Sequence, residues 1–533
     1  MSTSSFNKPI YDALKSDKFQ KRLAQLQKYN DSDTSKLLLF QFSDYVYADA
    51  YRTLELNNKN ILLHCAEAGN FGDISQTYFF AEKIKKARPD CNISILFQLQ
   101  TKDKEPFEAV FPVKQYNTHF IPRFAVYNEK EKLLETAFNS GCVIGVAVPI
   151  ATPHLYKKHH RSLREYGFGT HPDTKDNNLS MGFSLNEEGI SIPTIPARQL
   201  HDIQSPWLKQ ALAINSSETQ NQYHNKNQLY NLYTRDWTAY IVGINTIAAL
   251  ENKNSKVIDI VSPFQSTLQD LIDWKILDRE NLKKQGINKI TRITSEGSES
   301  ISLGDGEGKE MRIVSGAFSK SDLEALQQHS QPFFGCTGDM TYSESVVLNK
   351  IPFYDIVSHK ESFFKGMKKL AEDLNLESLS SFFNLLSNVV DNETEVYKKN
   401  TPRKQGGWWG DPPCYDIANP TSVARKSVNE LIPLYTQFAN KIADCCSDPK
   451  LLHEVTQFNT YIQANCNVEA KLLAMVDRGL ILANYPELIE VEKNLWERFQ
   501  KNEISLESVF IELKNSIQQA VQNQQRNSNK MQM

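Results

Sequence analysis

The sequence predicts an α/β fold with two sheet layers and an added C-terminal helical region. Three features lead to this prediction. Short apolar runs alternate with helix-like segments between residues 60 and 148, a pattern typical of parallel strands that are buried on both faces. The alternation begins again near residue 255 and ends near residue 360. From Glu361 onward, helical periodicity continues almost to the end of the chain.

The bulk composition fits a globular protein of two to four domains. The chain has 533 residues, of which 40% are hydrophobic, enough to bury extended cores. Its net charge of −3 gives no basic field, so we expect no nucleic-acid partner. Neither a signal peptide nor an 18-residue apolar run is found, which predicts a soluble cytoplasmic protein without a membrane span. The eight cysteines form no C-x-x-C pair and favour a reducing compartment.

The first layer begins with an apolar strand at 61–65. The turn AEAGNFGDIS follows it and leads into a helix over 76–88, where apolar residues recur at roughly helical spacing. Further strands are expected at 93–97 and 142–148. Residues 151–200 are expected to form loops and short strands at the carboxyl edge of this sheet.

The second layer follows a polar stretch at 216–228, which is typical of a helix face or a hinge between domains. A helix over 319–328 is predicted to open with Ser319 as N-cap and Asp322 at the third position, the pattern of a capping box. The other elements expected are strands at 257–261, 290–293 and 311–314 and a helix at 266–276.

Two such layers indicate two facing Rossmann-like domains. The cleft between them is the expected ligand site, because ligands bind beyond the carboxyl ends of the strands in such sheets. The predicted segments are an N-terminal helical extension (1–57), an N-terminal Rossmann-like acceptor domain (58–215), an interdomain linker or helix (216–250), a C-terminal Rossmann-like donor domain (251–370) and a helical region (371–533).

The most informative stretch is QPFFGCTGDMTYSESVVLNKIPFYDI, residues 331–356. It is expected to form a strand, a glycine-rich turn, a short helix and a second strand. Gly335 and Gly338 let the backbone turn sharply and approach a ligand, and Asp339 and Thr341 offer N-cap oxygens to the helix. A helix N-terminus approached by glycines is a ready anion site, because unpaired N–H groups and the positive end of the dipole point to the same place.

The part GCTGDMTYSESVVLNKIPFYDI closely resembles the donor-binding motif of GT-B glycosyltransferases. It is similar to the G-x-G-T-x-x-E pattern and following G-x-P-x strand of the lipid-II-forming N-acetylglucosaminyltransferases. The resemblance implies that the turn and the helix N-terminus hold the diphosphate of a sugar nucleotide, and that a carboxylate on the helix binds the ribose. The donor-binding residues so implied are Gly335, Gly338, Asp339, Thr341, Ser343 and Glu344.

A second, narrower resemblance concerns NFGDI at residues 70–74, which is similar to a turn of bacterial protein-arginine rhamnosyltransferases, also GT-B enzymes. An aspartate in that turn is implicated in activating the acceptor, so the resemblance implies Asp73 as a catalytic residue. That family carries another aspartate just before the turn, where this chain has Gly69; Glu67, two residues earlier, is the second candidate. The family's Arg-Gly-Glu-Asp-Ser donor motif is met only partly, so the resemblances imply the fold and the reaction class but neither sugar nor acceptor.

Four further residues are predicted to lie on the acceptor side of the cleft: Asn70, Gly72, Tyr166 and His171. Several histidines cluster between residues 154 and 171, but they have neither a cysteine partner nor an H-E-x-x-H spacing, so no metal site is predicted. Structural interpretations stay open for the main candidates. Glu344 also fits an ordinary polar helix start, and Asp73 also fits a helix-capping aspartate.

The predicted function is transfer of a sugar from a nucleoside diphosphate to an acceptor, with a protein side chain as one expected acceptor. No metal or other cofactor is expected beside the sugar nucleotide, since no D-x-D motif ends a strand and helix N–H groups can stabilise a departing diphosphate. Two alternatives stay open: a GT-B-like binding module without catalysis, and a nucleotide-sugar epimerase. The helical segment at 495–515 also resembles bacterial effectors that are injected into host cells, which gives secretion into a host as a second expected location.

Overall fold

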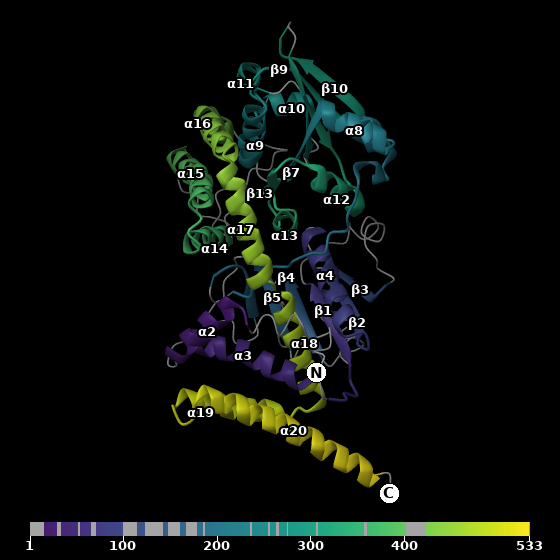
Figure 1. Ribbon diagram of the computed structural model, residues 1–533, viewed down its shortest axis with the longest axis vertical. Helices are drawn as coiled ribbons and strands as arrows, with labels where there is room; N and C mark the ends of the chain where they lie inside the picture. The colour runs from purple at the N-terminus through teal and green to yellow at the C-terminus, as the bar shows by residue number, and fades with distance from the viewer. Residues whose placement is uncertain are drawn as a thin grey trace. The chain divides into compact units, whose positions relative to one another are not determined.

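The structure is a computed structural model of the whole chain, in which the described residues form two compact units (Figure 1). The first unit comprises Met1–Ile192 and Ile462–Met533, and the second comprises Pro193–Tyr461. The described residues are 15–28, 33–51, 54–65, 71–99, 115–122, 142–147, 160–166, 178–184, 187–234, 237–253, 256–262, 266–273, 275–304, 308–356, 360–400 and 422–531.

The first unit contains a six-stranded sheet whose described pairs are all parallel. Its strand order is β3-β2-β1-β4-β5-β6, the order of a doubly wound dinucleotide-binding sheet. The order reverses between β1 and β4, and this reversal is where such sheets bind their ligands. The strands are β1 (Asn60–Cys65), β2 (Asn92–Leu99), β3 (Asn117–Pro122), β4 (Cys142–Ala147), β5 (His160–Tyr166) and β6 (Asn178–Met181).

Helices from both ends of the chain cover the first sheet. The C-terminal helix α18 packs against β4, α4 and α3. Gly479 permits this contact, because a Cβ at that position would collide with the Cys142 side chain. The helices of this unit are α2 (Asp17–Lys28), α3 (Asp33–Tyr51), α4 (Phe71–Ala87), α18 (Glu469–Asn484), α19 (Leu488–Gln500) and α20 (Leu506–Met531).

Buried ion pairs fix α18 in this position. Arg88 makes two hydrogen bonds to the Asp477 carboxylate, at 2.9 Å from Nε and 2.6 Å from Nη2, and both side chains are almost fully buried. Lys471 pairs with Asp44 of α3 at 2.7 Å, also out of solvent. The single helical region expected at 371–533 is therefore divided, since its last three helices belong to the first unit. Helical periodicity in the sequence could not show this division.

The second unit contains a seven-stranded sheet of order β10-β9-β11-β8-β7-β12-β13. All its pairs are parallel except β10 with β9, which form an antiparallel hairpin. The order reverses between β7 and β12. The strands are β7 (Asn227–Leu232), β8 (Val257–Ser262), β9 (Ile287–Thr294), β10 (Gly297–Ser302), β11 (Lys309–Ser315), β12 (Phe333–Cys336) and β13 (Ile351–Tyr354).

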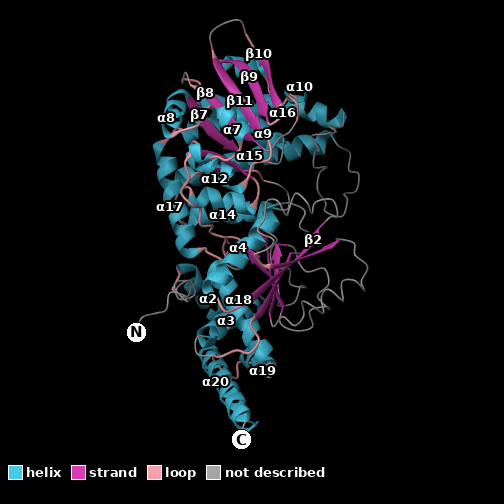
Figure 2. Ribbon diagram, turned by 90° about the vertical axis from the view of Figure 1, so that its right-hand side faces the viewer, coloured by secondary structure: helices cyan, strands magenta, loops and turns pink. Residues whose placement is uncertain are grey.

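Helices accompany this sheet as well, so each unit is an α/β layer (Figure 2). The helices of the second unit include α9, which packs against β7 and α16. They are α7 (Pro206–Leu212), α8 (Ser217–Lys226), α9 (Trp237–Leu250), α10 (Leu268–Asp273), α11 (Arg279–Lys284), α12 (Lys320–His329), α13 (Asp339–Val347), α14 (Glu361–Asp373), α15 (Glu377–Asn400), α16 (Ser422–Cys446) and α17 (Pro449–Asn465), with a 3-10 turn at Leu200–Asp202.

The predicted α/β class with two Rossmann-like sheets and C-terminal helices is confirmed. One segment differs: residues 216–250, expected as a linker or helix, supply β7 to the interior of the second sheet. The sequence of β7, NQLYNL, hides this role because three of its six residues are amides. Asn231 is nevertheless buried, and its Nδ2 donates to the Gly335 carbonyl at 3.1 Å. Within the described residues, no helix is long and apolar enough to cross a membrane.

Candidate functional site

The motif at 331–356 folds as expected into a strand, a turn, a helix and a strand. These are β12, α13 and β13, and β12 lies directly beside β7. The chain leaves β12 at Cys336 and enters α13 through Thr337 and Gly338. The N-terminus of α13 therefore lies at the carboxyl end of β12, next to β7, where the strand order of this sheet reverses. Ligands usually bind at this position in open α/β sheets.

The two glycines of the motif have different roles. Gly335 lies inside β12, where a Cβ would come within 2.8 Å of Leu232 Cδ1 and 2.9 Å of Leu232 Cα. Its small size is thus required by the packing of β12 against β7, and it is not part of the turn as predicted. Gly338 is the N-cap of α13, and a Cβ there would meet only Thr341 Oγ1 at 3.8 Å. A Cβ at Gly338 would therefore collide with none of the described residues.

The first turn of α13 presents its backbone N–H groups without a side-chain cap, because Gly338 takes the N-cap position predicted for a polar side chain. Asp339 is instead the first helical residue, and its carboxylate forms an ion pair with Lys360 at 2.6 Å. Both of these side chains are nearly buried. Lys360 thereby neutralises a negative charge that would repel an anion from the helix N-terminus.

The remaining donor candidates lie along α13. Thr341 is partly exposed in the first turn, whereas Ser343 is fully buried and does not line a surface. Glu344 is partly exposed and accepts a hydrogen bond at Oε2 from Gln327 Nε2, at 2.9 Å. Burial raises the pKa of Glu344 to about 7, which the Gln327 hydrogen bond and the Lys320 charge oppose.

No sequence pattern pointed to Gln327, which belongs to α12, is fully buried and contacts Glu344. A second unforeseen group is Thr234, just past the carboxyl end of β7. Its hydroxyl is buried and has no hydrogen-bond partner among the described residues. Neither residue belongs to a sequence motif. Their relevance follows only from the contact of α12 with α13 and from the position of β7 in the sheet.

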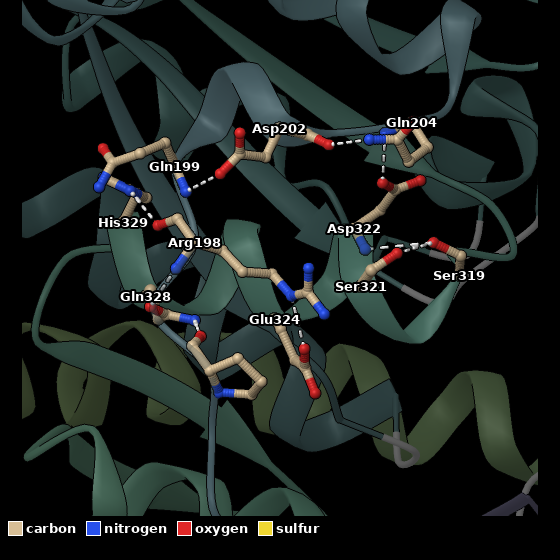
Figure 3. A network of polar contacts seen from close by, with 11 residues as sticks. Arg198, Gln199, Asp202, Gln204, Ser319, Ser321, Asp322, Glu324, Gln328 and His329 are labelled. Atoms are coloured by element: carbon tan, nitrogen blue, oxygen red, sulfur yellow. Dashed lines mark hydrogen bonds and ion pairs between the residues drawn. The ribbon is translucent and has the colours of Figure 1, made fainter.

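The helix α12 is fixed to the segment at 196–204 by a network of polar contacts (Figure 3). Arg198 Nε lies 2.7 Å from the Glu324 carboxylate, and the Arg198 backbone N–H donates to Gln328 Oε1 at 3.1 Å. Gln328 Nε2 in turn donates to the Pro196 carbonyl at 2.9 Å. These contacts hold α12, and with it Gln327, in one position against the rest of the second unit.

The capping box predicted at the start of α12 is only half formed. Ser319 Oγ accepts from the Asp322 backbone N–H at 3.1 Å, as expected. The Asp322 carboxylate does not return this bond but accepts from the backbone N–H groups of Gln204, at 2.6 Å, and Ser205, at 3.2 Å. The reason is tertiary: the 196–204 segment brings competing donors to the carboxylate (Figure 3).

In the first unit, Asp73 lies in the first turn of α4, the helix that follows β1. This turn is at the point where the strand order reverses, so the position suits a ligand-facing group. The helix begins at Phe71, earlier than predicted, and Gly72 is its second residue. An aspartate in a first turn also stabilises its helix through the dipole, so the catalytic role of Asp73 stays a prediction.

The other candidates of the first unit are described only in part. Tyr166 is the last residue of β5 and pairs with Met181 of β6. Glu67, Asn70 and His171 lie outside the described residues. Over the described ranges, no group of three or more His, Cys, Asp or Glu side chains is placed to hold a metal ion.

Comparison with known proteins gives similarities to solved structures only. No protein-family model and no curated protein matches the chain. Among the similar structures is MurG from Acinetobacter baumannii, with 11% identity and a TM-score of 0.33 over 62% of this chain and 91% of that one. A glycosyltransferase from Rickettsia africae has 12% identity and a TM-score of 0.34 over 78% and 96% of the two chains. A UDP-GlcNAc 2-epimerase from Methanocaldococcus jannaschii has 11% identity and a TM-score of 0.32 over 58% and 92%.

Proposed function

We propose that this chain is a glycosyltransferase that takes its sugar from a nucleoside-diphosphate donor held by the second unit. The observation that carries the proposal is the position of α13. Its N-terminus has no side-chain cap and lies where the strand order of the second sheet reverses. A Cβ at Gly338 would collide with none of the described residues, and Glu344 is on the same helix.

The geometry suits the chemistry of sugar transfer. Negative charge builds on the diphosphate as the bond to the sugar breaks, and helix N–H groups fixed in advance stabilise that charge without reorganising. Such groups do this without a metal ion, so the proposed mechanism is metal-independent. Glu344 follows Asp339 by five residues, or about 7.5 Å along the helix axis, and would accept hydrogen bonds from the ribose hydroxyls.

Asp73 is the proposed acceptor-activating group. Its support is the place of α4 at the strand-order reversal of the first sheet and the resemblance of residues 70–74 to a known acceptor-activating turn. A carboxylate there would remove a proton from a hydroxyl or orient a nitrogen nucleophile. On the same resemblance we propose a protein side chain as the acceptor.

The first test is thermal stabilisation by a panel of nucleoside diphosphates and sugar nucleotides that differ in base and sugar. At 100 times its dissociation constant, a bound donor stabilises the chain by about 2.7 kcal/mol, which raises the melting temperature. We expect the rise to be lost in Glu344→Ala and kept in Glu296→Ala, whose side chain is in the exposed β9–β10 turn. If no nucleotide stabilises the wild-type chain, the donor site is refuted.

The second test is mass spectrometry of candidate acceptor proteins after incubation with the chain and the stabilising sugar nucleotide. An added sugar mass that disappears with Asp73→Ala supports the assignment of both the reaction and the residue. Transfer that survives Asp73→Ala removes this residue from the mechanism. Conversion of the sugar nucleotide into an isomer without any acceptor would instead place the chain among the epimerases.

A further inference from the structure

We infer that Gln327 is a positioning residue for nucleotide binding: it fixes the Glu344 carboxylate so that one oxygen stays available to the ribose. The inference rests on the proposed donor site. It extends that site by a residue that belongs to no sequence motif. It is carried by three features of α12 and α13, namely the direct contact, the buried amide and the rigid support of α12.

The direct contact divides the two oxygens of the carboxylate. Gln327 Nε2 donates to Glu344 Oε2 at 2.9 Å, whereas no hydrogen bond from the described residues reaches Oε1. Glu344 is only partly exposed, so its side chain has few rotamers available once Oε2 is held. A carboxylate with one oxygen fixed and one unused is prepared to accept hydrogen bonds from a diol without losing further rotational freedom.

The buried amide is costly unless it serves another group. Gln327 is fully buried, and its Oε1 has no hydrogen-bond partner among the described residues. A methionine of similar volume would fill this place in α12 without leaving a polar atom unsatisfied. The amide NH2, in contrast, donates to the ionised carboxylate of Glu344 and holds it in place.

The support of α12 makes the contact rigid. Arg198 and Gln328 tie this helix to the segment at 196–204: Arg198 Nε lies 2.7 Å from the Glu324 carboxylate, and Gln328 Nε2 donates to the Pro196 carbonyl at 2.9 Å (Figure 3). Because α12 is held at several points, Gln327 meets Glu344 in a fixed geometry. This arrangement is typical of a residue that acts through another residue rather than on the ligand itself.

The charges around Glu344 are few and can be named. Lys320 and Glu324 face it from α12, and Cys336 faces it from β12. Glu324 is paired with Arg198 at 2.7 Å, and on α13 itself Asp339 is paired with Lys360. Burial, followed by the charge of Glu324, raises the pKa of Glu344, while the Gln327 hydrogen bond lowers it.

The pH dependence of nucleotide affinity follows with a definite sign. An ionised carboxylate accepts hydrogen bonds from both ribose hydroxyls, so affinity should rise as the pH increases through about 7, where Glu344 loses its proton. Removing Gln327 removes a hydrogen bond that favours the ionised form. The rise in affinity should therefore move to higher pH, by about one unit, in Gln327→Met.

The experiment compares wild type, Gln327→Met, Glu344→Gln and the matched control Gln269→Met between pH 5.5 and 9. Gln269 is an exposed glutamine of α10 that likewise donates to a carboxylate, that of Asp273 at 2.7 Å, and it has no part in the support of α12. The first measurement is the affinity for the sugar nucleotide that most stabilises the wild-type chain, since its diphosphate does not titrate in this range. We expect a shifted profile in Gln327→Met, a flat one in Glu344→Gln and an unshifted one in Gln269→Met.

The second measurement needs no nucleotide. The melting temperature of Glu344→Gln minus that of wild type should grow with pH up to about 7, because the raised pKa of Glu344 lowers wild-type stability until the group is ionised in the folded state. The melting temperature of Glu344→Gln minus that of Gln327→Met should continue to grow up to about pH 8. Profiles of Gln327→Met that overlay wild type in both measurements overturn the inference. Shifted melting profiles without any nucleotide binding would instead keep the contact and refute the proposed donor site. Should Gln327→Met fail to fold, Gln327→Leu replaces it, with the same shift to higher pH expected from the loss of the hydrogen bond.

Discussion

At the scale of single residues, the two motif glycines show how one residue type serves two purposes a few positions apart. Gly335 is needed because β7 passes too close for a side chain, whereas Gly338 leaves the end of α13 uncovered. Both were predicted to line the donor turn, because a sequence pattern does not distinguish packing from access. Substitution by alanine should therefore have different effects at Gly335 and at Gly338.

Gly335→Ala should destabilise the second unit by about 1–3 kcal/mol, because Leu232 must move to make room for the new methyl group. Gly338→Ala meets no such obstacle, and its φ of −99° is accessible to alanine, so the stability cost should stay near the 1 kcal/mol typical of a poorer N-cap. Nucleotide affinity should nevertheless fall in Gly338→Ala, since the methyl group covers the helix end. Urea unfolding and nucleotide titration of both variants check this pair. Equal loss of stability in the two variants would contradict the distinction.

At the scale of elements, the strands that are buried and apolar were the ones that the sequence predicted best. Strands with unbroken apolar runs, such as β1, β4 and β8, were predicted within a residue or two. β7 was not, because three of its six residues are amides, and the Asn231 amide meets its partner, the Gly335 carbonyl, only in the folded sheet. β10, GSESIS, was missed because it is largely exposed. For the candidate site, the sequence predicted the helix and the position of Glu344 on it, whereas anion binding at the helix N-terminus stays a prediction. It could not predict Gln327, whose meaning depends on how α12 packs against α13.

The docking of α18 is an element-scale property that can be tested through its ion pair with Arg88, the residue that follows α4. Asp477→Asn leaves the Arg88 guanidinium buried without a counter-charge, which should cost about 3–5 kcal/mol of stability. The matched control is Asp90→Asn, which breaks the largely exposed pair with Lys59 in the same unit and should cost less than about 1 kcal/mol. Denaturant unfolding of both variants measures the difference. A small loss in Asp477→Asn would mean that this pair does not fix α18.

At the scale of the whole molecule, the chain begins and ends in the same unit. The second unit, Pro193–Tyr461, is a continuous insertion in the sequence, and it contains β7, α12 and α13, the elements that form the proposed donor site. The first unit, in contrast, needs two distant segments, because α18 packs against β4 and α3. The two units should therefore respond differently to truncation. The second unit should fold without the rest of the chain, whereas the first unit should not fold without residues 462–533.

A fragment of residues 193–461 should fold alone, with a cooperative melting transition and the same nucleotide preference as the whole chain. It keeps every strand of its sheet and all the residues around Glu344 named above.

A chain that stops at residue 461 should lose the first unit. It would expose the apolar faces of β4 and α3, and it would leave Arg88 and Asp44 buried without Asp477 and Lys471. Limited proteolysis followed by mass spectrometry should then recover a protected fragment near 193–461 from the truncated chain, whereas the full chain should also protect the first unit. Protection of residues 54–99 in the truncated chain would contradict the assignment of α18 to the first unit's core.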